Sequence, residues 1–380
     1  MREIDFGTIM TLVKGKKPRQ LFKEAQEGAL PYVDIKAFER NEVQNYTDGV
    51  KCVPCDENDV LIVCDGSRSG LVGKGIKGYV GSTLAKVSAE GIIRDYLYYF
   101  LQSKYRVFNT HKKGTGTPHL NQELLKSQKI IVLPIQQQQK IVSRIEELFS
   151  KLDKGVETLQ TTKQQLAVYR QAVLTEAFEG IENTVELGSI ASIVDPHPSH
   201  RTPVEVIGGV PYIGVGDIDY VHHVIDFSSS RKVSNDILQD HLSRYTLHDG
   251  DFIMGKIGTI GKPFIIALPQ NYTLSANVIL IQPNKKVVIP KYLFWQVSSS
   301  QITKQLLEGS TSTTQPAFGI KKARLLSIKI CSLEEQNRIV QKIESHLSLC
   351  DDIGQSVTAA LSQAEAMRQS ILKQAFEGKL

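Results

Sequence analysis

The chain has 380 residues, with 45 Lys and Arg against 40 Asp and Glu and a net charge of +5, which predicts two or three domains. Hydrophobic residues at 41% and charged residues at 22% are typical of globular proteins and exclude disordered and collagen-like classes. The absence of a long apolar run or signal-peptide region, and five sparse cysteines that favour reduced thiols, lead us to expect a cytoplasmic protein.

Residues 1–134 are expected to form a first globular domain of mixed α and β structure. A short apolar run at residues 60–63, bounded by turn residues, predicts a strand, and residues 96–102 predict a short helix. This region holds 20 basic and 15 acidic side chains, an excess of five positive charges.

Residues 135–180 are predicted to form one long amphipathic helix. Pro134 is a start signal and Gly180 a C-terminal cap, while the interior Gly155 costs about 1 kcal/mol relative to Ala and indicates a kink or a close contact. Apolar side chains recur mostly at steps of three and four residues, which is typical of a helix that pairs with another helix. The predicted pairing residues are Ile141, Ile145, Leu148, Leu152, Leu159, Leu166, Tyr169 and Val173.

Residues 181–332 are expected to form a second globular domain similar to the first. Strands are predicted at residues 252–254, 264–267 and 278–281, and a short helix near residues 292–298. This region holds 14 basic and 12 acidic side chains. The excess positive charge of the chain thus lies on the two globular regions, which indicates contact with a polyanion, with a solvated basic surface as the alternative.

Residues 333–380 repeat the first long helix. Residues 133–180 align without a gap on residues 331–378 at a constant offset of 198, and the closing Ala177-Phe178-Glu179-Gly180 recurs unchanged. Gly354 is again an interior glycine. We expect the two helices to pair antiparallel, related by an approximate twofold axis, through Val340, Ile343, Leu347, Val357, Leu361, Met367 and Ile371.

Motifs for nucleotide chemistry are incomplete in this sequence. It contains no Asn/Asp-Pro-Pro-aromatic tetrapeptide of an adenine methyltransferase. Residues 255–262 resemble a phosphate loop, but Lys256 stands where a glycine is needed and Pro263 replaces Ser or Thr. We therefore interpret this stretch as a strand followed by a glycine-rich turn.

Motifs for metal chemistry are also incomplete. Cys52 and Cys55 are half of a zinc site without a second pair, and we interpret them as turn residues. Asp34-Ile35-Lys36 resembles part of a nuclease motif, but the second domain has Gly214-Val215-Gly216 there. No histidines in the first domain match those of the second, which we interpret as loop and DNA-surface residues: His197, His200, His222 and His223.

Polar and cationic loops occur at corresponding places in both domains. Arg and Lys contact phosphates or guanine edges, and Ser, Thr and Gln read base edges by hydrogen bonds. The candidate DNA-binding residues of the first domain are Lys16, Lys17, Arg19, Ser67, Arg68, Lys74, Lys77, Lys112, Lys113, Thr115 and Thr117. Those of the second domain are His200, Arg201, Arg231, Lys232, Lys256, Thr259, Lys262, Ser310, Thr311, Ser312, Thr313 and Gln315.

This arrangement resembles the DNA specificity subunit of a type I restriction-modification enzyme. The resemblance covers nearly the whole chain and rests on two variable domains alternating with two similar helices, together with short motifs. In the first domain, residues 65–68 stand where the second has its glycine-rich turn. The motifs are the turn Gly258-Thr259-Ile260-Gly261-Lys262, the openings Gln137-Gln138 and Glu335-Gln336, and the closing Ala-Phe-Glu-Gly.

The resemblance implies an α+β fold, with two target-recognition domains and two long antiparallel coiled-coil helices. It implies a non-catalytic subunit in which each domain reads one half of a split DNA site and the helices set the spacing. The implied partners are two methylation subunits that use S-adenosylmethionine and restriction subunits that use ATP and magnesium. A two-domain nuclease or methyltransferase and a structural coiled-coil scaffold are the alternatives.

Overall fold

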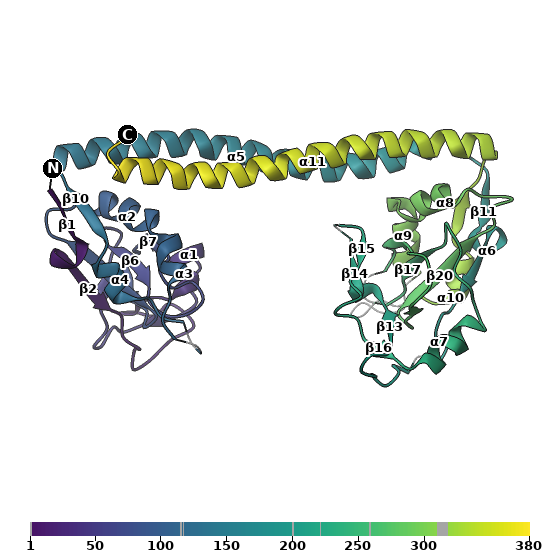
Figure 1. The fold of residues 1–380 in the computed structure, drawn as a ribbon, viewed down its shortest axis with the longest axis horizontal. Coiled ribbons are helices and arrows are strands. Elements are labelled where there is room, and N and C mark those ends of the chain that lie inside the picture. The colour runs from purple at the N-terminus through teal and green to yellow at the C-terminus, as the bar shows by residue number, and fades with distance from the viewer. Residues whose placement is uncertain are drawn as a thin grey trace. The chain divides into compact units, whose positions relative to one another are not determined.

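The computed structural model describes residues 2–114, 116, 118–199, 201–220, 222–257, 260–309 and 318–380. It divides into residues 1–160 with 358–380 and residues 161–357, and each unit joins a globular domain to parts of two long helices (Figure 1). Several expected DNA contacts lie outside the described residues: Thr115, Thr117, His200, Thr259, Ser310, Thr311, Ser312, Thr313 and Gln315.

The first domain contains two four-stranded sheets and a terminal strand pair. One sheet has the antiparallel order β2 (Met10–Lys14), β9 (Leu84–Ala89), β6 (Val60–Val63), β7 (Val72–Lys74). The other has the order β4 (Tyr46–Thr47), β3 (Leu30–Val33), β8 (Gly78–Val80), β5 (Pro54–Cys55), with β3 and β8 parallel. The terminal pair is β1 (Arg2–Asp5) with β10 (Lys129–Val132), which leads directly into the first long helix.

The first domain has two apolar cores, one between the sheet that contains β6 and the long helices and one between its two four-stranded sheets. The helices of this domain are α1 (Ile35–Arg40), α2 (Arg94–Ser103), α3 (Tyr105–Thr110) and α4 (Gln122–Lys126). Helix α2 buries Tyr96, Leu97 and Phe100, a spacing that places these side chains together on one face, where they pack on the sheet and on the long helices. The sequence therefore builds α2 as the layer that joins the domain to the helices.

The second domain repeats this plan. Its main sheet has the order β12 (Ala191–Val194), β20 (Val278–Pro283), β17 (Phe252–Gly255), β18 (Pro263–Ile265), and its smaller sheet the order β16 (Lys232–Val233), β13 (Val210–Ile213), β19 (Thr273–Leu274). The terminal pair is β11 (Thr184–Glu186) with β21 (Ser327–Lys329). A hairpin, β14 (Ile218–Asp219) with β15 (Val224–Ile225), stands where the first domain has α1.

The helices of the second domain are α6 (Leu187–Ile190), α7 (Asn235–Leu242), α8 (Pro290–Val297), α9 (Ser300–Glu308) and α10 (Ile320–Arg324). Helix α8 buries Tyr292 and Leu293 as α2 buries Tyr96 and Leu97. Each domain thus has the same β-sheet and helix layers, as the sequence repeat predicts.

The two long helices are α5 (Ile135–Ala177) and α11 (Leu333–Phe376), and they pack together antiparallel. In the second unit the Tyr169 hydroxyl lies 2.8 Å from His346 Nδ1, and Lys342 Nζ lies 2.9 Å from Glu176 Oε1. Moving forward along α5 from residue 169 to residue 176 therefore means moving backward along α11. The expected α+β fold with paired antiparallel helices is confirmed.

The predicted pairing residues differ in their burial. Ile145, Val173, Val340, Ile343, Leu347 and Val357 are buried, and Ile141, Leu148, Leu152, Leu159, Leu166, Leu361 and Ile371 are partly buried. Tyr169 and Met367 are 43% and 48% exposed, although Tyr169 still reaches the facing helix through its hydroxyl. Four further apolar residues of the long helices are buried, although the prediction left them out: Val142, Phe149, Leu174 and Leu372. The reason is that the ends of each helix pack on a globular domain as well as on the other helix.

The interior glycines of the long helices mark neither a close contact nor an interruption. A Cβ atom added at Gly155 or Gly354 would meet nothing within 4 Å, and α5 and α11 are continuous through both positions. Among the described residues, no helix combines the length and the apolar character that crossing a membrane requires.

Candidate nucleic-acid interface

In each domain, one loop joins the main sheet, which contains β2 or β12, to the smaller sheet, which contains β3 or β13. This loop carries cations in both domains. In the first domain this loop connects β2 to β3 and holds Lys16, Lys17 and Arg19, which are exposed and have no ion-pair partner among the described residues. In the second domain the loop between β12 and β13 holds the exposed Arg201. The candidate DNA-binding residues of these two loops were predicted separately, and they lie in equivalent loops of the two domains.

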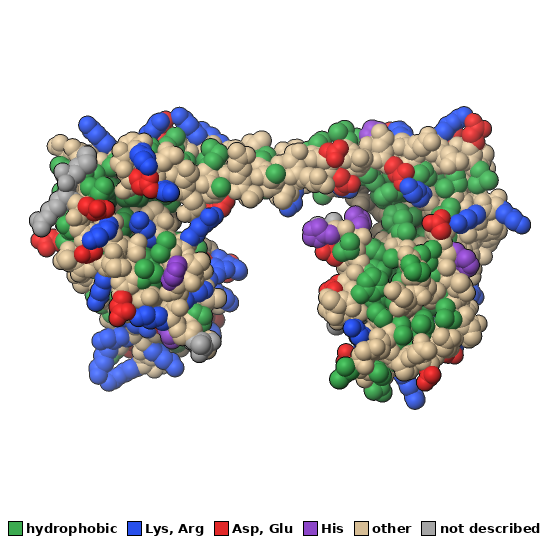
Figure 2. Space-filling model, in the orientation of Figure 1, with side chains coloured by type: hydrophobic (Ala, Val, Ile, Leu, Met, Phe, Trp, Pro, Cys, Tyr) green, Lys and Arg blue, Asp and Glu red, His purple; other side chains and the backbone are tan. Residues whose placement is uncertain are grey.

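A second cationic group of the first domain joins two loops that are distant in sequence. Lys112 Nζ and Asn109 Nδ2 donate to the Ser67 carbonyl oxygen at 2.8 and 3.0 Å, and Arg68 pairs with Glu39 of α1. These contacts hold Ser67, Arg68 and Lys112 together at one end of the domain. Figure 2 shows that Lys and Arg side chains gather on the first domain away from the long helices.

The other candidate cations of the second domain lie near β16 and the glycine-rich turn. Arg231 is exposed, and its Nη1 donates to the Pro203 carbonyl oxygen at 3.2 Å, while Lys232 is partly buried. Lys262 Nζ lies 5.6 Å from the centre of the Tyr220 ring, which fits a cation–π contact. Arg231 and Lys262 therefore keep an exposed charge on a side chain whose position is defined by a neighbour.

Lys256 does not belong to the exposed cations. It is 6% exposed, and its Nζ lies 2.9 Å from Asp195 Oδ2, so it joins the ends of β17 and β12. The equivalent strands of the first domain are joined by Lys14 and Asp65, whose Nζ and Oδ2 atoms lie 2.8 Å apart. The two domains have exchanged the cation and the anion of this ion pair, and its role is to hold the strand ends from which the loops begin.

His197 is a buried residue and not the surface residue that the sequence suggested. It is 7% exposed, its Nδ1 lies 2.9 Å from His241 Nε2, and His241 also contacts Thr273. Burial, with a contribution from His197, lowers the pKa of His241 to about 4. His241 therefore stays neutral near pH 7. The two buried rings pack against the smaller sheet and are not available at the surface.

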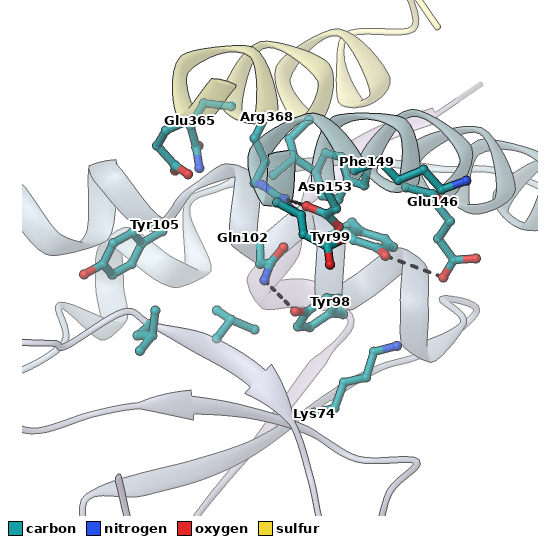
Figure 3. A pocket seen from close by; sticks show the side chains of 17 residues that line it. Lys74, Tyr98, Tyr99, Gln102, Tyr105, Glu146, Phe149, Asp153, Glu365 and Arg368 are labelled. Carbon is teal, nitrogen blue, oxygen red and sulfur yellow. Dashed lines mark hydrogen bonds and ion pairs between the residues drawn. The ribbon is translucent and has the colours of Figure 1, made fainter. Parts of the chain in front are cut away.

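A cavity of about 690 Å³ lies between the first domain and its long-helix segments, and Lys74 is one of its walls (Figure 3). Lys74 Nζ is 3.1 Å from Asp95 Oδ1, so its charge is paired on the helix side of the domain. The cavity walls include Glu146, Glu157 and Glu365, which have no ion-pair partner among the described residues. The walls also include Asp153 and the cations Lys154 and Arg368, so their charges nearly balance. Because Lys74 lies on the helix side with its charge paired to Asp95, it is not part of the same surface as the cationic loops.

A buried glutamine joins each domain to its long helix. Gln138 is fully buried: its Nε2 donates to the Gly91 and Leu133 carbonyl oxygens at 2.7 and 2.8 Å, and its Oε1 accepts from the Ile93 amide at 2.9 Å. Gln336, at the repeat offset, makes the equivalent bonds at 3.1, 2.9 and 2.8 Å. The sequence repeat includes both glutamines, but the alignment alone assigns them no role.

No metal-binding group is found in the part of the chain that the structure describes. No three His, Cys, Asp or Glu side chains there are grouped as a metal ion needs. Cys52 and Cys55 are free thiols, and burial raises the pKa of Cys55 to about 12.

The chain belongs to the family of type I restriction modification DNA specificity domains, whose model matches residues 3–166 and 182–363. It is the DNA specificity subunit of a type I restriction-modification system, and this subunit is not itself catalytic. The expected family and function are confirmed.

Relatives and solved structures agree with this assignment. The chain is 24% identical to the MjaVIII specificity subunit of Methanocaldococcus jannaschii, with 99% of this chain and 92% of the relative covered. It is 22% identical to the EcoBI specificity subunit of Escherichia coli, with 85% and 73% covered.

Two solved structures share the fold. A chain from a study of complex assembly and conformational transition of the type I R-M system has a TM-score of 0.73 at 16% identity, with 100% of this chain and 98% of that chain covered. The HsdS subunit from Thermoanaerobacter tengcongensis has a TM-score of 0.54 at 16% identity, with 100% and 97% covered.

Proposed function

We propose that this specificity subunit reads a split, asymmetric DNA site, with each globular domain recognising one half. The observation that carries the proposal is that both domains keep the same junction to the long helices, through Gln138 and Gln336, while their exposed loops differ. Two domains that are attached to the helices in the same way but expose different loops are suited to recognising two different DNA sequences independently.

The proposed DNA contacts are the exposed or partly buried candidates of the cationic loops. Lys74 and Lys256 are left out, because the first lines the cavity beside the long helices with its charge paired to Asp95 and the second is buried in an ion pair. The described residues that remain are Lys16, Lys17, Arg19, Ser67, Arg68, Lys77, Lys112, Lys113, Arg201, Arg231, Lys232 and Lys262.

The long helices are proposed to set the spacing between the half-sites and to dock two methylation subunits. S-adenosylmethionine would be held by those subunits, and ATP and magnesium by restriction subunits, all in the cytoplasm. The cavity beside α5 and α11 supports docking of protein there, since its walls combine tyrosine and apolar side chains with charges of both signs.

Exchange of one domain tests the two-reader proposal. Residues 181–332 would be replaced by the equivalent part of a related specificity subunit, and methylated sites would be sequenced in a host carrying the complete system. One half of the methylated sequence should change and the other should persist. A change in both halves would mean that recognition is shared across the chain.

A binding measurement distinguishes a DNA reader from a coiled-coil scaffold. The complete methylation complex should bind a duplex with the methylated sequence in a salt-dependent way, and bind a scrambled duplex more weakly. Equal binding to both duplexes would contradict sequence-specific reading.

A further inference from the structure

The cationic loop that precedes the smaller sheet ends in the same four-residue turn in both domains. The Ala29 amide donates to the Gln26 carbonyl at 3.1 Å, and the Gly209 amide donates to the Val206 carbonyl at 3.1 Å. The third residue of each turn is a glycine with positive φ, 77° at Gly28 and 73° at Gly208. The backbone thus presents the second residue of each turn in an equivalent way.

The second turn presents an apolar residue to solvent. Ile207 is 103% exposed and Val204, in the same loop, is 83% exposed. The loop is nonetheless held in place, because the Val206 amide donates to the Lys232 carbonyl at 2.9 Å and Arg231 donates to the Pro203 carbonyl at 3.2 Å. Because the side chain of Ile207 stays in water, it contributes no free energy of apolar burial to folding.

The surroundings of Ile207 indicate what covers it. Arg201 and the exposed acid Glu205 lie in the same loop, and Arg231 and Lys232 lie on the hydrogen-bonded segment that enters β16, so three cations stand against one exposed acid. Cations around an apolar tip match a DNA groove, where phosphates flank base edges and the thymine methyl group is the apolar feature.

The first turn carries a different chemistry at the equivalent position. Glu27 is exposed and makes no hydrogen bond or ion pair with the described residues, and its loop also holds Lys16, Lys17 and Arg19. A carboxylate is repelled by phosphate, but it accepts a hydrogen bond from the cytosine amino group in the major groove. The loop also holds a second exposed acid, Glu24, so it is the position of Glu27 at the tip of the turn that fits it for a base contact.

We propose that Glu27 and Ile207, at the tips of these equivalent turns, are specificity-determining residues that touch base edges of the two half-sites. Glu27 accepts from a cytosine amino group in the first half-site, and Ile207 packs on a thymine methyl group in the second. This inference rests on the proposed function, in which each domain reads one half.

The test uses the complete methylation complex and a plasmid library in which every position of both half-sites is varied. Ile207→Ser should reduce discrimination at one position of the second half-site by at least about fivefold and leave the first half unchanged, which is the low end of the cost of a mismatched base pair. Glu27→Gln should do the same in the first half-site only.

Matched controls separate base contact from general effects. Leu325→Ser, at an apolar residue of the second domain that is 62% exposed, and Glu90→Gln, at an exposed acid of the first domain, should leave both half-sites unchanged. Arg231→Ala should weaken binding to all sequences if it contacts phosphate. The melting temperature of each tip variant should equal that of the parent.

Two outcomes would overturn the proposal while leaving the two-reader function intact. One is unchanged discrimination in both tip variants although domain exchange alters one half-site. The other is loss of assembly with the methylation subunits in Ile207→Ser, which would show that the tip docks protein. If Ile207→Ser altered both halves together, the two-reader function itself would fail.

Discussion

Arg368 of α11 forms an ion pair with Asp153 of α5, and the same two repeat positions form the pair Arg170 with Asp351 in the second unit. Each helix therefore contributes the arginine to one pair and the aspartate to the other. An antiparallel pair of repeated helices produces this exchange, because a residue and its repeat meet the same surface from opposite helices.

The ion pair of the first unit should be worth little by itself. Asp153→Ala is expected to lower the free energy of unfolding by no more than about 1 kcal/mol, as for other exposed pairs. Arg368→Ala should cost more, because the Arg368 guanidinium also lies 4.4 Å from the centre of the Phe149 ring. Urea denaturation of both single variants and the double variant checks this, and equal costs for the two single variants would exclude a contribution from the ring.

The buried glutamine is expected to matter far more than the ion pair. Gln138→Leu leaves two carbonyl oxygens and one amide without their side-chain partner, which should cost about 3 kcal/mol or more. Gln139→Leu is the matched control, since Gln139 is exposed on the same helical turn, and should cost less than about 0.5 kcal/mol. Similar unfolding midpoints for the two variants would contradict a role in the junction.

Alanine at the interior glycines should stabilise the chain. Gly155→Ala and Gly354→Ala are each expected to add about 0.5 to 1 kcal/mol, because the new methyl group meets nothing within 4 Å and Ala favours a helix. Thermal unfolding of the single and double variants measures the gain. A lower melting temperature would mean that a bend at these positions is part of the native state.

The second domain should lose stability in acid through His241. Its pKa is lowered to about 4, so the unfolded chain takes up a proton near its ordinary value of 6.5 while the folded chain does not. Stability is therefore complete above about pH 6.5 and falls as the pH drops towards 4, by on the order of 3 kcal/mol. His241→Gln should flatten this pH dependence of the unfolding midpoint, and an unchanged pH profile would assign it to other groups.

Matched insertions in the two long helices should change the gap between the half-sites. Four residues added to α5 after Val156 and four added to α11 after Val357 lengthen each helix by about 6 Å. Methylated-site sequencing should then show a longer gap with both halves unchanged. A gap that stays the same would mean that the partner subunits, and not the helices, set the spacing.

The long helices could be predicted from sequence because a gapless repeat and a periodic apolar stripe both point to them. The role of Gln138 could not, since a glutamine within a helix is usually exposed, and its burial follows only from the carbonyl groups that the domain places around it. The buried ion pair of Lys256 could not be predicted from sequence either. The neighbours of Lys256 in sequence are typical of a surface turn, and its partner Asp195 is 61 residues away.

The side chain of Gln138 bonds only to backbone atoms of the domain, the Gly91 and Leu133 carbonyl groups and the Ile93 amide. Every amino acid supplies a carbonyl group, and every one except proline an amide hydrogen, so these three hydrogen bonds make no demand on the side chains of the domain. The apolar packing of α2 on the long helices does make such a demand. We therefore expect that a domain of different sequence can be mounted on the same helix if its backbone follows the same path and it keeps apolar residues at the positions of Tyr96, Leu97 and Phe100. The hydrogen bonds of the junction thus tolerate sequence change within the domain, and we expect that replacing one domain can bring a new DNA preference without changes to the helices.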